Sequence, residues 1–460
     1  MLNASLRAAG GVGAALLFSY LLQHDARACG GCFHPPPHPN ENPSVVTDHR
    51  MILGITKQES TLWDQISYSG EPSSFAWVLP ISGTVRVALS ADSIFQGLDR
   101  LTATTIHPPP TNCPTATPPR TGSGCSSTTS AQAQSAPGAL REAGVEVTSH
   151  NVVGPYETVQ LRATDPNALE TWLAQNGFVV PQDVKPVVDA YVAEKFDFLA
   201  LRLLPGKGVN DMRPVRVTTA GPNAVLPLRM VAAGTGPVVG ITLWVVAEGR
   251  YEPQNFPWFR IRDDELAWDW SHDRSDYVEL RAQKTEAAGG RAWNIESSTT
   301  PGTAFIQASF PDNNGSLGYA GDYLADDAAQ KSGEQVRKDD LAALFAAAAL
   351  GSARITRMRA DLSHAALATD LVMVAAPDQS VLPTDLTPAK EIGQPLCPAY
   401  SDLENLGMIP RDQAQAYADK HETFSCTTGG RSRSAFWLGA GAAAMALAAA
   451  RGWRRRRTRG

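Results

Sequence analysis

Two cysteines and two histidines lie within ten residues near the start of the chain, in the segment Cys29-Gly-Gly-Cys32-Phe-His34-Pro-Pro-Pro-His38. Thiolate and imidazole groups suit Zn²⁺ and copper ions, so these four side chains are weak candidates for a metal site. A c-type haem is excluded, because its attachment needs C-x-x-C-H and Phe33 occupies the histidine position. A disulfide between Cys29 and Cys32 is the simpler interpretation, and thiol–disulfide exchange by the same pair is a third.

A second group of candidates combines tryptophans with acidic residues between positions 258 and 293. Aromatic rings beside carboxylates can bind a sugar, and a suitable carboxylate pair can hydrolyse a glycoside. Tryptophans at such spacing more often belong to a core, with the acids on a solvated face. The chain contains neither G-x-S-x-G nor H-E-x-x-H, so we assign no catalytic residue and no cofactor. The group comprises Trp258, Asp263, Asp264, Glu265, Trp268, Asp269, Trp270, His272, Asp273 and Trp293.

The six cysteines of the chain predict disulfides rather than metal sites if the protein is exported. Their order suggests the pairs Cys29/Cys32, Cys113/Cys125 and Cys397/Cys426, although the sequence alone permits 15 pairings of six cysteines. The short loop favours Cys113–Cys125 above the others. Cys426 has a competing interpretation, as the residue at which a C-terminal tail is processed, and Cys397 would then need another partner or stay free.

Residues 1–28 have the three parts of a secretory signal peptide. Arg7 supplies the positive start, an apolar run covers residues 12–22, and an A-x-A box ends at Ala28, directly before Cys29. We therefore predict cleavage after Ala28. A lipoprotein with an acylated Cys29 is the weaker alternative, because Arg27 stands where such sites prefer a small residue.

The C-terminus predicts a membrane anchor. Residues 435–450 are apolar and mostly alanine, Trp437 and Trp453 flank them, and six arginines follow from Arg451 onward. As a helix this run would span about 24 Å, short of a hydrocarbon core of about 30 Å. The arginines would stay in the cytoplasm, which places residues 29–430 on the other side of the membrane.

The charge distribution argues against nucleic-acid binding. The whole chain has 40 basic and 46 acidic residues. The signal peptide contains two of the basic residues and one acid, and the segment from Arg431 onward contains eight arginines, so the part between carries a net charge of −15. A domain this acidic repels phosphate backbones. The expected partner is the membrane, through the tail, while a protein or glycan ligand is not identified.

Composition and periodicity divide the chain into six segments. We expect a signal peptide (1–28), a β-rich unit (29–106), a loop rich in Pro, Ser and Thr (107–139), a central α+β unit (140–325), a C-terminal α+β unit (326–425) and the tail (426–460). Strands are predicted at 51–55, 75–79, 85–89, 196–204, 226–231, 238–246 and 354–362, and helices at 91–101, 166–177, 182–194 and from a cap at Asp340 to Gly351. Helices in clusters indicate an α+β fold with largely antiparallel sheets.

Several motifs resemble a known bacterial family. ACGGC around Cys29, FAWVLP (75–80), VGPY (153–156), WLAQNG (172–177), FDFLA (196–200), LWVV (243–246) and TRMR (356–359) occur in the order found in the exported family catalogued as domain of unknown function 2330. The resemblance covers roughly residues 29–376, and it implies an exported envelope protein without an established activity. The low-complexity segment around Cys113 and Cys125 departs from the family pattern.

The tail resembles a second known element. The segment SCTTGG around Cys426, the apolar run and the terminal arginines are similar to the myxobacterial C-terminal sorting signal. In that family a Cys before the helix marks where the tail is removed and the protein anchored, and Cys426 matches that position. The leading hypothesis is an exported, membrane-anchored envelope protein with a structural or binding role, and the alternative is an envelope hydrolase or metal-dependent enzyme.

Overall fold

The computed structural model describes residues 32–33, 45–69, 76–114, 147–162, 167–178, 184–208, 211–232, 235, 237–311, 323–400 and 405–422. These residues form two compact units, one within 1–110 and 123–393 and a smaller one within 111–122 and 394–460. Within the described residues no helix is long and apolar enough to cross a membrane. The predicted signal peptide, most of the Pro/Ser/Thr-rich loop and the tail lie outside the described residues.

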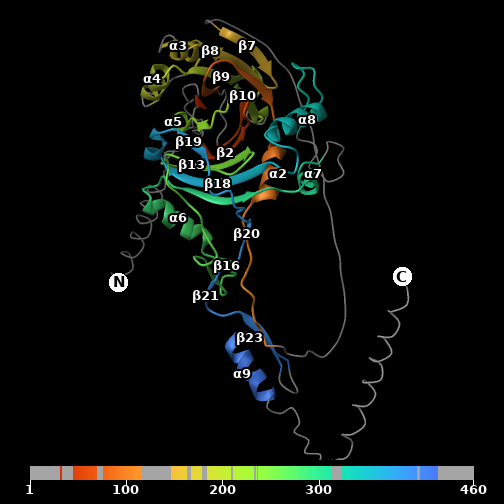
Figure 1. The fold of residues 1–460 in the computed structure, drawn as a ribbon. Coiled ribbons are helices and arrows are strands. Elements are labelled where there is room, and N and C mark those ends of the chain that lie inside the picture. Colours follow the sequence, from red (N-terminus) through yellow and green to blue (C-terminus); the bar gives the residue numbers. More distant parts are fainter. Residues whose placement is uncertain are drawn as a thin grey trace, which may run out of the picture. The chain divides into compact units, whose positions relative to one another are not determined.

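An eight-stranded sheet forms the centre of the larger unit (Figure 1). Its order is β14 (Trp258–Phe259), β17 (Trp293–Thr299), β18 (Arg354–Ser363), β12 (Val238–Ala247), β2 (Val45–Ile55), β3 (Glu59–Ser69), β10 (Val215–Ala220) and β5 (Val85–Leu89). Only β2–β12 and β14–β17 pair in parallel. The three predicted segments 29–106, 140–325 and 326–425 therefore all contribute strands to one sheet.

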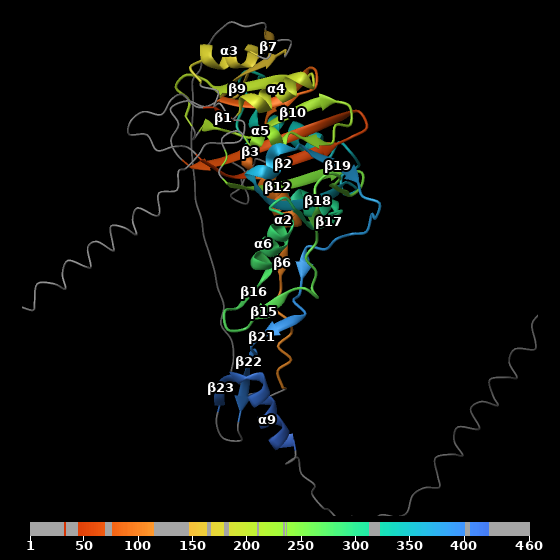
Figure 2. The same cartoon turned by 90° about the vertical axis from the view of Figure 1, so that its left-hand side faces the viewer.

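A five-stranded antiparallel sheet lies above it, as Figure 2 shows from the side. Its order is β1 (Cys32–Phe33), β4 (Ala76–Ile81), β9 (Asp197–Leu203), β8 (Tyr156–Leu161) and β7 (Val147–Val153). Alternate residues of these strands point to opposite faces. Trp77, Leu79 and Leu201 face β10 and β5 of the larger sheet, whereas Val78 and Phe198 face helices.

Helices cover the outer faces of both sheets. The five-stranded sheet is covered by α3 (Asn167–Gln175) and α4 (Lys185–Ala193). The opposite end of the unit has α2 (Asp92–Thr102), α7 (Thr303–Ser309) and α8 (Gly333–Leu344), which pack on the larger sheet around Trp63 and Trp244. Among the described residues, this unit also has the helical segments α5 (Leu228–Val231), α6 (Tyr277–Ala287) and the 3₁₀ turn η2 (His364–Ala368).

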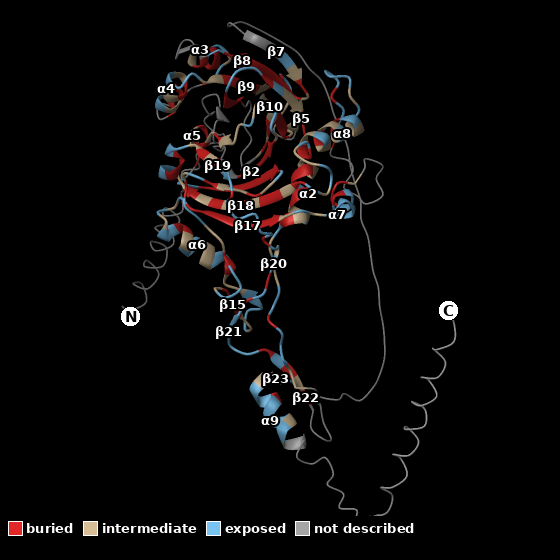
Figure 3. Cartoon of the chain, in the orientation of Figure 1, coloured by how far each residue is buried: buried red, intermediate tan, exposed pale blue. Residues whose placement is uncertain are grey.

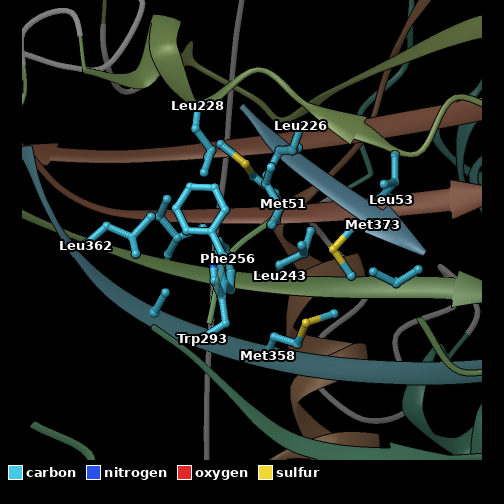
Figure 4. Packing of buried hydrophobic residues seen from close by; sticks show 14 of the residues in the cluster. Met51, Leu53, Leu226, Leu228, Leu243, Phe256, Trp293, Met358, Leu362 and Met373 are labelled. Carbon is cyan, nitrogen blue, oxygen red and sulfur yellow. The ribbon is translucent and has the colours of Figure 1, made fainter. Parts of the chain in front are cut away.

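The largest apolar cluster occupies the second face of the eight-stranded sheet (Figure 4). Met51, Leu243 and Met358 from three adjacent strands meet Leu228 of α5 and Met373 of β19. The central strands are buried along nearly their whole length (Figure 3). Three small sheets complete the unit, with the strands β11 (Val225–Leu226), β19 (Leu371–Ala375), β13 (Tyr251–Pro253), β16 (Arg274–Ser275), β15 (Ala267–Asp269), β21 (Lys390–Ile392), β20 (Asp385–Leu386) and β6 (Thr105–Ile106).

The described residues of the smaller unit form one hairpin and one helix. Strands β22 (Leu396–Tyr400) and β23 (Asn405–Pro410) pair antiparallel, and α9 (Arg411–Glu422) follows. Cys397, Ala399 and Ala414 form its buried centre, and Cys113 packs against them. The Arg411 guanidinium donates to the carbonyl of Thr111 at 3.3 Å, so residues near 111 belong to this unit together with the hairpin.

The α+β class with mostly antiparallel sheets is confirmed, and two element predictions are wrong. Residues 226–231 were expected to be one strand, but β11 ends at Leu226 and Pro227 precedes the helical turn α5. Asp340 was expected to cap a helix, yet α8 begins at Gly333, with the Ser332 hydroxyl accepting from the Gln335 amide at 3.3 Å. Asp340 lies inside α8, where its carboxylate accepts hydrogen bonds from side chains in the core.

Candidate functional site

The predicted tryptophan and acid group does not form a carbohydrate platform. Trp268 is buried and Trp293 is fully buried in the apolar cluster of the large sheet, whereas Trp258 is 42% exposed. Trp270 donates to Glu391 at 2.7 Å and meets Trp268 edge to face. Two of the four rings are therefore core residues, as expected for the interpretation in which tryptophans form a core and acids a surface.

Asp269, Ser271 and His272 form a polar turn on the surface. The Asp269 carboxylate accepts from the Ser271 hydroxyl at 2.5 Å and lies 2.8 Å from Nδ1 of His272. These bonds, the one from Ser271 first, lower the pKa of the Asp269 carboxyl. Ser271 contacts the same ring nitrogen at 2.9 Å. In a catalytic triad the serine and the acid hydrogen-bond to opposite nitrogens of the histidine ring. Here both contact Nδ1 of His272, so this turn is not a catalytic triad.

Two further acids of the group make ion pairs, while Asp263 accepts from the Thr387 amide at 2.9 Å. Asp264 pairs with Arg262, and Glu265 pairs with Lys284 at 2.5 Å. The hydrogen bond from Arg262 lowers the pKa of Asp264. These carboxylates are held as ions on the surface and are not poised as general acids.

Cys113 and Cys397 form a disulfide across 284 residues of sequence. The predicted pairing of Cys113 with Cys125 is therefore wrong, and so is the alternative pairing of Cys397 with Cys426. Proximity along the chain misled the prediction, because the segment around Cys113 packs on β22 instead of turning back on itself. Cys125 and Cys426 lie outside the described residues.

The weak metal candidates cannot be placed as a set. Cys32 belongs to β1, where it pairs with Trp77 of β4, but Cys29, His34 and His38 lie outside the described residues. Ala28, the predicted cleavage position, also lies outside them. In the part of the chain that the structure describes, no three His, Cys, Asp or Glu side chains cluster as metal ligands.

Two buried polar side chains lie between the sheets without hydrogen bonds. His49 of β2 is fully buried, its Nδ1 lies 3.7 Å from Oδ1 of Asp64 on β3, and neither ring nitrogen has a partner. A cavity of about 10 Å³ beside Asp64 is otherwise lined by apolar side chains such as Leu79. That volume suits about one water molecule. The cavity beside Asp64 has room for a water but not for a substrate.

A cavity of about 270 Å³ lies along the outer edge of β5. We call it the β5 cavity. Its walls are β5 at Val87–Leu89, β7 at Asn151–Val153, the turn 326–331 and the start of α8. Arg216, Asp326, Lys331 and Asp339 supply its charged groups.

A buried carboxylate fixes one wall of the β5 cavity. Nη1 of Arg216 donates to Asp340 at 3.1 Å. Asp340 is fully buried and also accepts from Trp63 at 2.7 Å, Ser90 at 2.6 Å and Tyr323 at 2.8 Å. Burial raises the pKa of the Asp340 carboxyl, and the Arg216 charge opposes that effect. The network holds the Arg216 side chain rigid at the cavity wall.

The other charged side chains of the cavity are also hydrogen-bonded within the protein. Lys331 donates to Asp339 at 2.7 Å, and Gln335 donates to the second oxygen of that carboxylate at 2.7 Å. The lysine bond is the main cause of the lowered pKa of Asp339. Asp326 accepts from the Ala329 amide at 3.1 Å and so closes the turn. The cavity is thus polar on one side, where both cations have a carboxylate partner and Asp326 accepts from a main-chain amide.

The sequence analysis missed this site. Arg216 stands between Val215 and Val217 in a short strand, and a cation in such a strand signals a buried partner without saying which residue it is. The partner, Asp340, is 124 residues away. Lys331 and Asp339 carry no motif at all.

Comparison with known proteins supports the family resemblance. A family model described as "Uncharacterized protein conserved in bacteria (DUF2330)" matches residues 25–373. None of the curated proteins matches the chain significantly. The tail that resembles a sorting signal lies outside the matched residues.

Weak structural similarity exists to baculovirus P35. The cleaved mutant P35 is 8% identical, with a TM-score of 0.24 over 45% of this chain and 67% of that one. P35 in the caspase-8 complex is 11% identical, with a TM-score of 0.24 over 45% and 65%. Similarity at this level indicates neither a shared fold nor a shared activity.

Proposed function

The chain belongs to the bacterial DUF2330 family of uncharacterized proteins, and from this premise we propose that it is an exported cell-envelope protein with a binding or structural role. The disulfide between Cys113 and Cys397 is the observation that carries the proposal. Disulfides persist in oxidising compartments outside the cytoplasm and are rare inside it. A bond that joins residues 284 positions apart suits a protein that folds after export.

The sequences at the two ends of the chain support this cellular location. A signal peptide cleaved after Ala28 would direct export, and the apolar run 435–450 with its arginines would hold the protein at the membrane. Because Cys397 already has Cys113 as its partner, Cys426 is not required for that bond. This supports the sorting role for Cys426, with the ectodomain displayed on the outer side of the membrane.

A binding role fits the described sites better than the alternative of an envelope hydrolase. Asp269 and Ser271 address the same nitrogen of His272, which does not suit nucleophile activation. The β5 cavity, in contrast, offers a rigid polar wall beside an apolar one. A cavity with one apolar and one polar wall is typical of a ligand-binding site.

Mass analysis of the protein from the envelope fraction tests export and the disulfide together. We expect a mature chain that begins Cys-Gly-Gly-Cys at Cys29, and a peptide that joins Cys113 to Cys397 under non-reducing conditions and separates on reduction. An envelope-bound protein that retains Met1 would overturn the signal-peptide assignment. Free thiols at Cys113 and Cys397 would remove the main support for an oxidising location.

The substitution Cys426→Ser tests the sorting role. We expect a chain that keeps its terminal arginines and stays in the inner membrane, while the melting temperature of the ectodomain is unchanged because the Cys113–Cys397 bond is intact. Cys125→Ser is the control that removes another cysteine without affecting processing. Normal processing of the Cys426→Ser variant would exclude Cys426 as the sorting residue.

A further inference from the structure

The β5 strand has one open edge, and the β5 cavity lies along it. β5 is the last strand of its sheet and pairs only with β10. Main-chain groups of successive residues in a strand point alternately to the two sides. The Ser90 amide donates inward to Pro214, whereas the main chain of Val85 points outward. Val87 and Leu89 lie two and four residues after Val85, so their N–H and C=O groups point to the same outward side and face the cavity.

The protein itself already pairs an amide with this edge. The Gln160 side chain accepts from the Val85 N–H at 3.1 Å and donates to the Val85 C=O at 2.8 Å. A residue of an added strand would make the same two bonds. Within the described residues, no hydrogen bond beyond the β5–β10 pair reaches the main chain of Val87 or Leu89. The edge is therefore capped at one end and open along the next two outward positions.

The two sides of the cavity differ in polarity. Leu89, Val153 and Val336 are buried on the side that faces the five-stranded sheet. Arg216 lies on the opposite face of the larger sheet, beside Asp339 of α8. An extended peptide also has two faces, because its side chains alternate.

The cations of the cavity argue against an acidic partner. Lys331 is paired with Asp339 and Arg216 with Asp340, so neither cation is left to neutralise a charge on a ligand. Lysine has three donors and arginine five, and each side chain shows one bond to a carboxylate. The remaining N–H groups can donate to carbonyl or hydroxyl oxygens.

We propose that the β5 cavity binds an extended peptide segment by strand addition to Val87 and Leu89, with apolar side chains toward Val153 and uncharged polar side chains toward Arg216. The step from Val87 to Leu89 spans about 7 Å of strand. The cavity has a volume of about 270 Å³. These dimensions suit the central two or three residues of a bound strand. Main-chain bonds would supply affinity, and alternation would supply selectivity.

Binding is measured with fluorescein-labelled five-residue peptides of alternating threonine and valine, added to the purified full-length chain. We expect saturable polarisation, and roughly tenfold weaker binding when the peptide amides that face β5 are N-methylated. A peptide of the same composition with both valines adjacent breaks the alternation and should bind several-fold more weakly. A central aspartate should weaken binding similarly, because an added negative charge would find no cation without a carboxylate partner.

Two variants at one position separate the main chain from the side chain. Val87→Pro removes the outward N–H and spares the ladder with β10, since proline is tolerated where the N–H faces away from the sheet. Val87→Ala keeps the N–H and shortens the side chain, so it is the matched control. We expect at least tenfold weaker binding for Val87→Pro and less than threefold for Val87→Ala. Hydrogen exchange gives a readout that needs no variant, because bound peptide should protect the amides of Val87 and Leu89 more than that of Ala88.

The inference rests on the proposed binding role, but its test is independent of export. Equal binding of the N-methylated and unmodified peptides, or no binding by any alternating peptide at about 1 mM, would overturn strand addition. Neither result bears on the mature N-terminus or on the disulfide. Retention of Met1 would, conversely, overturn export and leave the peptide assay unaffected.

Discussion

Replacing Asp340 by alanine should be among the most destabilising single changes in the larger unit. Asp340 is fully buried inside α8, and its carboxylate receives Arg216, Trp63, Ser90 and Tyr323. Alanine would leave a buried guanidinium without a counter-charge and three donors without an acceptor. Loss of one partner from a buried pair typically costs about 3–5 kcal/mol. The three further donors place the expected loss in the upper part of that range.

The neighbouring residue provides a matched control. Asp339 is on the same helix and also has two partners, Lys331 and Gln335, but its side chain is 27% exposed. Asp339→Ala should cost only about 0.5 kcal/mol, because water replaces the lost partners. At roughly 2–4 °C per kcal/mol for a domain of this size, the Asp340 variant should melt about 10 °C below the wild type, and the control within a few degrees.

The pH dependence adds an independent check. Burial raises the pKa of Asp340 in the folded state. A carboxyl with a raised folded pKa contributes stability that is fully present below its unfolded pKa of about 3.9 and declines as the pH rises through the folded value. The stability gap between wild type and Asp340→Ala should therefore be wider near pH 4 than near pH 8. Urea unfolding at both pH values measures it.

Similar stabilities of the Asp340 and Asp339 variants would contradict the proposed role of the buried network. If the Asp340 and Asp339 variants unfold within about 1 kcal/mol of each other, the buried network does not hold α8 on the sheet. The double variant Arg216→Met with Asp340→Leu provides a second, separate test of the network. That pair should recover part of the loss, since an apolar pair replaces the buried ions.

Three further changes follow from the same structure. Gly97→Val should destabilise by about 1–3 kcal/mol in urea unfolding, because even a Cβ at Gly97 would meet the Phe310 ring at 2.1 Å, and an unchanged midpoint would contradict the packing. Cys113→Ser should lower the melting temperature of the hairpin unit under non-reducing conditions and match the wild type once both are reduced. Tyr191→Phe should cost about 1–2 kcal/mol through loss of the 2.6 Å bond to Asp370, and a neutral effect would show that this bond is replaced by water.

Local pattern predicted much of the fold. Apolar alternation located β5, a continuous apolar run located β12, and the apolar spacing of residues 91–101 located α2 to within a residue at each end. The end of α3 was readable because Gly177 has a φ of +83°, a conformation that favours glycine after a helix. The order of several motifs identified the family. Each of these signals is contained within a few consecutive residues.

The candidate site was not predictable in the same way. An arginine in a valine-rich strand and an aspartate in an alanine-rich helix are each readable as surface residues. Asp340 was even assigned to a helix end, where aspartate is usually found. Only the packing of α8 on Trp63 brings the two charges together. The open edge of β5 is likewise invisible locally, because strand order is set by pairings between distant residues.

The sequence by itself determined the class, the family and most strands and helices of this protein, since propensity and periodicity act over one or two turns. The sequence also predicted the signal peptide and the membrane-anchoring tail at the two ends of the chain. The tertiary structure decided that Cys113 joins Cys397, that Asp340 lies in the core and that β5 ends its sheet. These features depend on which segments meet after 124 or 284 residues of intervening chain. The physical reason is that a side chain's own sequence neighbours do not specify the partner it meets across such a distance.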